Sequence, residues 1–211
     1  VFVSKSFNAD KEELPSLGAK VCMAVDKAYD SEQHLPIEGS TEDRDAYGAD
    51  VGFIGTYAPE RGVDLMFLAE NGISVRVWGN GWDEFRRTHP NLNVEKRALV
   101  NRQGDLRYSK GIAATKINLG FLRKINRDLQ TDRSIEIPAC GGFMLAEYSS
   151  DHARLFADGR EAVFYLNLED LLEKTRYFLD HDEEREKIAV AGRVRCENSG
   201  YSHDARMAFM L

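Results

Sequence analysis

The chain has 211 residues and a formal net charge of -7, with 43% hydrophobic and 30% charged residues. This composition is ordinary for a globular protein with a sizeable core, and the acidic balance argues against a nucleic-acid groove, which needs a basic surface. No apolar run approaches the ~20 residues of a membrane span, and no signal peptide is apparent.

The cysteines and histidines predict no metal site and no disulfide framework. Cys22, Cys140 and Cys196 are far apart and odd in number, which favours a reducing cytoplasm. The five histidines lack metal-ligand spacing. The sequence begins at Val1 without a methionine and is still apolar at residues 207–211, so we expect a piece of a longer chain.

The first 45 residues favour a small β-α-β unit followed by a linker. The predicted elements are a strand at 1–4, a helix at 9–17 and a strand at 21–25. Residues 30–45 are rich in Ser, Glu, Asp and Gly, which indicates a loop between two domains. We therefore expect residues 1–45 to end an amino-terminal domain, and residues 46–211 to form a second domain.

From residue 50 onward, strand-like and helix-like segments alternate. Apolar, strand-like runs occur at 50–55, 73–78, 93–100, 116–122, 143–146 and 162–165, and predicted helices at 63–71, 83–88, 106–113, 131–140, 149–156, 168–179 and 182–197. This alternation predicts an α/β fold, a Rossmann-like parallel sheet with helices on both faces. Ligands of such sheets bind at the carboxyl ends of the strands, so loops 55–62, 79–82 and 131–142 should converge on one crevice.

The stretch 131–147 carries the strongest functional pattern. Arg133 and Glu136 are three residues apart and share a helix face, and a helix start with an arginine can bind an anion. Glu136 lies among apolar residues, and its carboxylate needs donors, which two ribose hydroxyls, a backbone amide or Arg133 could supply. The Gly141-Gly142 pair admits a ligand close to the main chain. Phosphate and diol together suggest a nucleotide.

The loop after the first strand of this region holds further candidates. Gly55 would let a phosphate approach the backbone, with donors from Thr56 and with Tyr57 in the same loop. An ordinary strand-to-helix turn would show the same residues. Arg61 stands at a helix start, where its guanidinium could fork onto phosphate oxygens or stay solvated.

Gly79-Asn80-Gly81 predicts a tight turn that lines the nucleotide crevice or holds no ligand. A dinucleotide fingerprint needs a third glycine, but Glu84 takes that position.

Charged residues near the strand at 116–122 complete the candidates. Lys116, Arg123 and Lys124 supply positive charge, and Lys116 is a candidate phosphate contact, although most lysines are simply solvated. Asp128 is a candidate for reaching a transferred group, or a surface acid. No nucleophile motif stands out, so the catalytic residues stay otherwise unassigned.

Taken together, these motifs resemble the spore-maturation-type (CgeB-like) glycosyltransferases over about residues 45–208. The stretch 133–142, Arg-Ser-Ile-Glu-Ile-Pro-Ala-Cys-Gly-Gly, carries most of the resemblance. The other segments are 50–56, 79–82, 116–122, 158–163 and 184–192. The first 45 residues also resemble the end of the amino-terminal half in that family.

The resemblance implies a GT-B enzyme with two facing Rossmann-like domains, of which the carboxy-terminal one holds a nucleotide-sugar donor. It implies Glu136 as the ribose-binding acid, Gly55 and Thr56 as the phosphate loop, and Arg61 as the cation of that loop. Asp128 falls where related retaining enzymes carry a second acid, and an aspartate there is a departure. Neither a metal nor another cofactor is implied.

We therefore predict the donor-binding half of a cytoplasmic glycosyltransferase. It would transfer a sugar from a nucleoside-diphosphate sugar, such as a UDP-sugar, to an unknown acceptor, with the acceptor base in a missing amino-terminal domain. One alternative is an NAD(P)-type dinucleotide-binding oxidoreductase, with the dinucleotide near residues 79–81. The other is a non-catalytic interaction domain on a degenerate glycosyltransferase fold.

Overall fold

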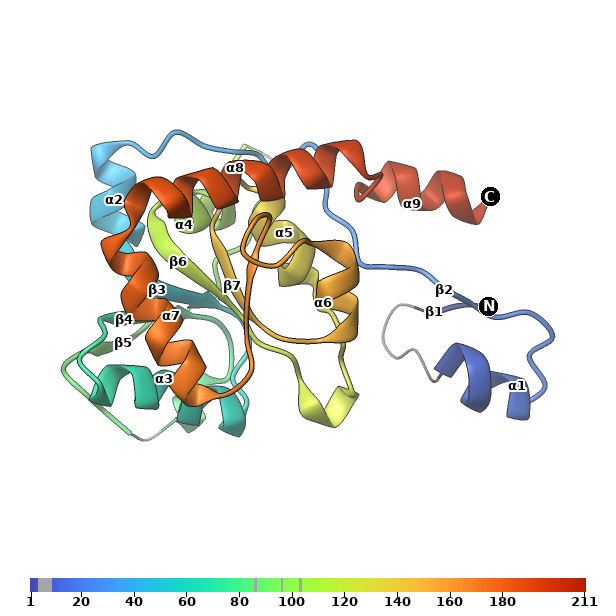
Figure 1. Cartoon of the computed structure of the whole chain (residues 1–211), viewed down its shortest axis with the longest axis horizontal. Helices are drawn as coiled ribbons and strands as arrows, with labels where there is room; N and C mark the ends of the chain where they lie inside the picture. Colours follow the sequence, from blue (N-terminus) through green and yellow to red (C-terminus); the bar gives the residue numbers. More distant parts are fainter. Residues whose placement is uncertain (4–8, 86, 96, 103) are drawn as a thin grey trace.

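A six-stranded parallel sheet forms the centre of the molecule (Figure 1). The computed structural model describes residues 1–3, 9–85, 87–95, 97–102 and 104–211. The strands are β3 (Ala49–Ile54), β4 (Val75–Trp78), β5 (Leu92–Glu95), β6 (Thr115–Gly120), β7 (Met144–Glu147) and β8 (Val163–Tyr165). Their order is β5-β4-β3-β6-β7-β8, and every neighbouring pair is parallel. The predicted fold class is confirmed. The direction of winding reverses between β3 and β6, which is where such sheets bind ligands.

Helices cover both faces of the sheet. One face packs against α3 (Pro59–Glu70) and α7 (Leu168–Asp180), and the other against α4 (Arg107–Ala113), α5 (Asp132–Ala139) and α6 (Ser150–Leu155). The long α8 (Asp182–Asn198) lies across α5. Successive strand residues point to opposite faces, so Phe53 joins one core cluster and Ile54 the other. Burial on both faces explains why the strands read as apolar runs.

Helices α2 and α3 begin at positions that differ from the sequence prediction. Residues 30–45 are not all loop, because α2 (Thr41–Tyr47) begins there, with Ser40 and Asp43 forming a capping box. Helix α3 begins at Pro59 rather than at residue 63, since proline suits the first turn of a helix. Arg61 and Gly62 are therefore helical, and Arg61 is held by a regular element rather than by a loop.

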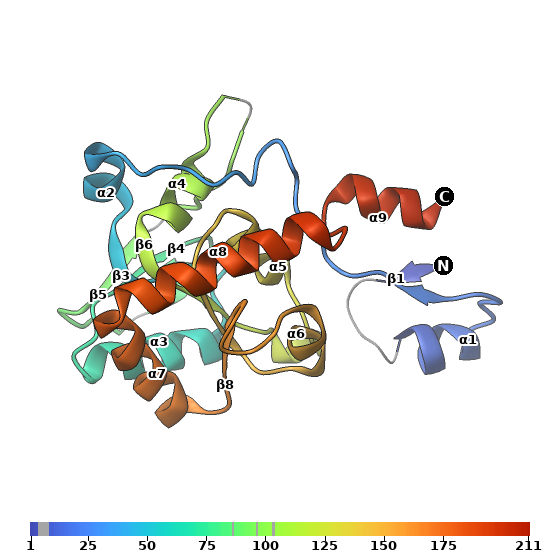
Figure 2. The same ribbon diagram turned by 45° about the horizontal axis from the view of Figure 1, so that its top comes forward.

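The amino-terminal segment forms the predicted small β-α-β unit beside the main sheet (Figure 2). Its strands β1 (Phe2–Val3) and β2 (Met23–Ala24) pair in parallel. Between them lie η1 (Ala9–Glu13) and α1 (Leu14–Ser16). Ser4, which the predicted first strand includes, lies outside the described residues. The carboxy-terminal α9 (His203–Met210) lies next to this unit. The division into two domains near residue 45 stays a prediction.

The remaining short elements are 3-10 turns, η2 (Trp82–Glu84) and η3 (Lys124–Asn126). The predicted helix 83–88 is thus reduced to η2, and the predicted strand 93–100 to β5; residues 86 and 96 of these predictions fall outside the described chain. None of the described helices combines the length and apolar character that crossing a bilayer requires.

Candidate functional site

A polar cavity of about 210 Å³ lies beyond the carboxyl ends of β3 and β6, at the point where the strand order reverses. Its lining residues are Lys27, Thr56, Arg61, Arg123, Asn126, Asp128, Gln130, Thr131, Asp132 and Arg133. Four of these are cationic and two acidic. The structure thus brings together five residues that the sequence singled out, Thr56, Arg61, Arg123, Asp128 and Arg133. Lys27 was missed because it comes from the amino-terminal segment. We call this cavity the arginine pocket.

Arg61 is the most buried cation of the arginine pocket, with only 8% of its surface exposed. Its guanidinium donates to the carbonyl of Thr56 at 2.8 Å and more distantly to that of Phe121 at 3.5 Å. Its Nε has no hydrogen-bond partner within the described part of the chain. Burial lowers the pKa of Arg61, and the positive charges of Arg133 and Arg123 lower it further. Buried cations that repel one another in this way favour the binding of an anion.

Arg133 reaches the same place from the first turn of α5. Its Nε donates to the carbonyl of Ile54, the last residue of β3, at 2.9 Å. Its only ion pair among the described residues is a 3.9 Å contact with Asp132, whose side chain is half exposed. Arg123 adds a third guanidinium, and its buried Nε also lacks a partner among the described residues. These cations are therefore left largely without carboxylate partners.

A buried histidine fixes the start of α5. Ser134 accepts a hydrogen bond from the Thr131 amide at 2.9 Å, and its hydroxyl lies 2.7 Å from Nε2 of His152. Nδ1 of His152 lies 2.6 Å from the carbonyl of Glu147, so Nδ1 carries the proton and Nε2 accepts from Ser134. This chain of bonds connects the end of β7 to the helix turn that carries Arg133.

The lowered pKa of His152 leads us to expect a loss of stability in mild acid. Burial lowers the pKa of His152 from its usual value of 6.5. The unfolded chain gains this proton first, so the stabilisation is complete above about pH 6.5 and is lost as the pH falls through the folded pKa. Urea unfolding between pH 7.5 and pH 5 should show stability falling more steeply in the wild type than in His152→Gln.

Asp64 changes the free energy of unfolding with pH in the opposite direction to His152. Burial raises its pKa to about 6, so its contribution is present at low pH and is lost as the pH rises towards 6. Asp64 is present in both the wild type and His152→Gln. The difference between their slopes of stability against pH therefore reports on His152 alone. Equal slopes would contradict a neutral, buried imidazole.

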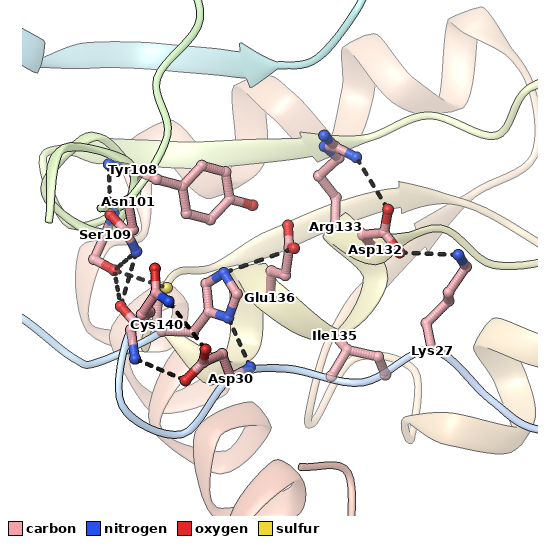
Figure 3. A network of polar contacts seen from close by, with 12 residues as sticks. Lys27, Asp30, Asn101, Tyr108, Ser109, Asp132, Arg133, Ile135, Glu136 and Cys140 are labelled. Atoms are coloured by element: carbon pink, nitrogen blue, oxygen red, sulfur yellow. Dashed lines mark hydrogen bonds and ion pairs between the residues drawn. The ribbon is translucent and has the colours of Figure 1, made fainter. Parts of the chain in front are cut away.

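Glu136 lies one helical turn further along α5, in a separate polar network (Figure 3). Its carboxylate is 3.6 Å from Nε2 of His34, which belongs to the segment after β2. Tyr108, at the start of α4, directs its hydroxyl towards Glu136 and Arg133. No direct ion pair between Arg133 and Glu136 occurs among the described contacts. The sequence could not indicate His34 or Tyr108, because both are distant from Glu136 along the chain.

The loops after β3 and β4 are hydrogen-bonded to each other, as expected from their convergence at one edge of the sheet. Tyr57 donates its amide to the carbonyl of Asn80 at 2.9 Å, and the Trp82 indole donates to the carbonyl of Gly55 at 2.8 Å. The Tyr57 ring packs edge-on against Trp82, with ring centroids 5.2 Å apart. At Gly79 a side chain would collide with the Gly55 carbonyl. The glycine there serves this close backbone packing.

Three predicted residues lie elsewhere, so the expectation that loop 131–142 joins the crevice along its whole length is wrong. Helix α5 runs from the carboxyl to the amino edge of the sheet, which carries Gly141 and Gly142 away from the arginine pocket. Lys116 is the second residue of β6, at that far edge, and pairs with Asp50 at 2.7 Å. The glycines end α5: Gly141 has φ +76°, and a Cβ at Gly142 would lie 2.4 Å from Ile112.

Among the described residues, no three His, Cys, Asp or Glu side chains are placed to hold a metal ion.

A family model described as glycosyl transferase-like matches residues 63–211. The chain belongs to this glycosyl transferase-like family. A search of curated proteins found no match. This glycosyl transferase-like chain is also similar to solved structures, at identities that establish the fold alone.

Three of these structures illustrate the likeness. Anabaena Alr3699/HepE in complex with UDP-glucose has a TM-score of 0.74 at 10% identity, over all of this chain and 62% of the other. Sucrose-phosphate synthase from Thermosynechococcus elongatus has a TM-score of 0.71 at 13% identity, over 100% of this chain and 56% of that one. The C-terminal domain of LpcC, a glycosyl transferase group 1 family protein from Francisella tularensis, has a TM-score of 0.61 at 12% identity, over 83% of this chain and 99% of that one. The chain therefore spans less than two thirds of the two larger proteins and has the fold of a GT-B carboxy-terminal domain.

Proposed function

We propose that this chain is the donor-binding half of a glycosyltransferase and that the arginine pocket holds the diphosphate of a nucleoside-diphosphate sugar. The observation that carries the proposal is the cluster of Arg61, Arg123 and Arg133 at the switch point of the sheet, largely without carboxylate partners. Membership of the glycosyl transferase-like family supports it. We also propose the CgeB-like subtype, on the motifs of residues 133–142.

In the proposed reaction, the acceptor oxygen forms a bond to the anomeric carbon and gives its proton to a base. The bond between the anomeric carbon and the diphosphate oxygen breaks, and negative charge grows on the leaving nucleoside diphosphate. Arg61 and Arg133 would stabilise that charge, with help from the amino end of α5. Asp128 lines the same cavity and is the candidate contact to the transferred sugar. The acceptor and its base would belong to the amino-terminal domain, and cationic side chains make a cofactor unnecessary in this scheme.

The proposed donor site is smaller than the sequence prediction. Thr56, Arg61 and Arg133 would contact the diphosphate, and Glu136 the ribose. Gly55 and Gly79 shape the adjoining loops, Tyr57 packs beneath them, and Asn80 is exposed at their edge. Lys116, Gly141 and Gly142 are left out. The free cysteines are consistent with a cytoplasmic location, which we propose as well.

Calorimetric titration of the 211-residue chain with UDP, GDP and their sugars tests the proposal. We expect at least one of them to bind with a Kd between roughly 1 μM and 1 mM. Absence of binding at about 5 mM of every nucleotide would overturn the proposal and favour a non-catalytic interaction domain. NADH is the control ligand: the packing of Gly79 on Gly55 already explains the turn at 79–82, so we expect no NADH binding.

Glu136→Gln should weaken UDP binding by about 10- to 100-fold, because a charged hydrogen-bond acceptor contributes about 1.5–3 kcal/mol. The same titration measures this effect. Glu161→Gln is the matched control, since Glu161 lies in the turn before β8 and does not line the arginine pocket. Unchanged affinity in Glu136→Gln would remove Glu136 from the proposed site.

A further inference from the structure

Tyr108 presents a buried hydroxyl group to Glu136. The residue is only 5% exposed, and its hydroxyl has no hydrogen-bond partner among the described residues. Such a buried, unpaired group costs free energy in the ligand-free protein. The hydroxyl points towards Glu136 in Figure 3. Burial raises the pKa of Tyr108 well above its usual value, and the nearby Glu136 carboxylate raises it further. Tyr108 therefore remains a protonated donor.

His34 presents a second donor to the same carboxylate. The amide of Asp30 donates to Nδ1 of His34 at 2.9 Å, which makes Nδ1 the acceptor and places the proton of the neutral ring on Nε2. Burial lowers the pKa of His34, so the ring is neutral at pH 7. Nε2 faces Glu136 at 3.6 Å, beyond the range of a direct hydrogen bond.

The two donors are held in place before any ligand arrives. The His34 and Tyr108 rings meet edge to face, with centroids 5.7 Å apart. The carbonyl of Gln33 accepts hydrogen bonds from Asn101 at 2.8 Å and from Ser109 at 2.9 Å. These bonds tie the segment around His34 to the start of α4, so the two donors keep their positions relative to each other.

We propose that Tyr108 and His34, together with Glu136, form a receptor for the vicinal cis-diol of the donor's ribose. Each ribose hydroxyl would donate to Glu136, one oxygen would accept from the Tyr108 hydroxyl, and the other from Nε2 of His34. The inference rests on the proposed function and extends it: two residues far from Glu136 in sequence make the site selective for ribonucleotides over deoxyribonucleotides.

The test compares UDP with 2′-deoxy-UDP by calorimetry on the full chain. We expect the wild type to prefer UDP by at least about tenfold, the effect of one good hydrogen bond. Tyr108→Phe and His34→Leu should each reduce this preference several-fold, mainly by weakening UDP. Tyr108→Phe should change the melting temperature of the free protein little, because the lost hydroxyl makes no close hydrogen bond and only a longer contact with Glu136.

Tyr165→Phe is the matched control. Tyr165 is 4% exposed and also has an unpartnered hydroxyl, but it belongs to the core cluster on the other face of the sheet. Removal of the Tyr165 hydroxyl should leave the preference for UDP over 2′-deoxy-UDP unchanged. If the wild type prefers UDP and both Tyr108→Phe and His34→Leu keep the full preference, the inference is wrong and the proposed function stands. Equal binding of UDP and 2′-deoxy-UDP by the wild type also overturns the inference alone, whereas no binding of any nucleotide overturns both.

Discussion

Arg61→Met is expected to weaken UDP binding by about 100-fold, the largest loss from any single side chain of the arginine pocket. Arg61 is buried among other guanidinium groups, and a charge-assisted bond to phosphate in such a place contributes up to about 3 kcal/mol. Methionine keeps most of the volume and removes the charge. Titration calorimetry at two salt concentrations measures both the affinity and its dependence on salt.

Arg160→Met provides the control for this change. Arg160 is exposed in the turn between α6 and β8 and does not line the arginine pocket. It removes the same charge from the chain, so any long-range effect of net charge on UDP binding appears in both variants. Equal affinities in Arg61→Met and Arg160→Met would show that the arginine pocket does not bind the diphosphate.

Gly79→Ala should destabilise the protein by about 3 kcal/mol or more, a loss in the upper range for single substitutions. A Cβ at this position would lie 1.9 Å from the Gly55 carbonyl oxygen, which is a backbone atom that no rotamer change can move. The loops after β3 and β4 would have to separate, which breaks the bond from Trp82 to Gly55. Urea unfolding measures the loss.

Gly81→Ala separates this clash from the general cost of replacing glycine. Gly81 has φ +79°, but the nearest atom to an added Cβ is 3.4 Å away, so only the conformational cost of about 1 kcal/mol is expected. Similar losses in the two variants would mean that the close approach of Gly79 to Gly55 does not decide the stability of these loops.

The sheet was predictable because its strands are buried on both faces and helix patterns separate them. The rule that ligands bind at carboxyl ends then indicated Thr56, Arg61 and Arg133 correctly as neighbours. The helix α2 was missed although its signal was present, since Ser40 and Asp43 have the spacing of a capping box.

Other features of the candidate site could not be predicted, because no local sequence pattern indicates them. Gly141 follows Arg133 closely in sequence, yet the eight residues of α5 carry it about 12 Å along the helix axis, to the other edge of the sheet. Adjacency in the chain therefore suggested a shared site that the helix direction excludes. Lys27 reaches the arginine pocket, and His34 and Tyr108 reach Glu136, through long-range packing, and such contacts leave no periodic trace in the sequence.

The two tryptophans of the chain, Trp78 and Trp82, have a practical consequence. Both are almost fully buried near the end of β4, and Trp82 is bonded to the loop that leads into the arginine pocket. Indole emission depends on the surroundings of the ring, so a nucleotide that shifts this loop would change the intrinsic fluorescence of the protein. Tryptophan fluorescence can therefore be used to follow nucleotide binding in the arginine pocket without attaching a dye.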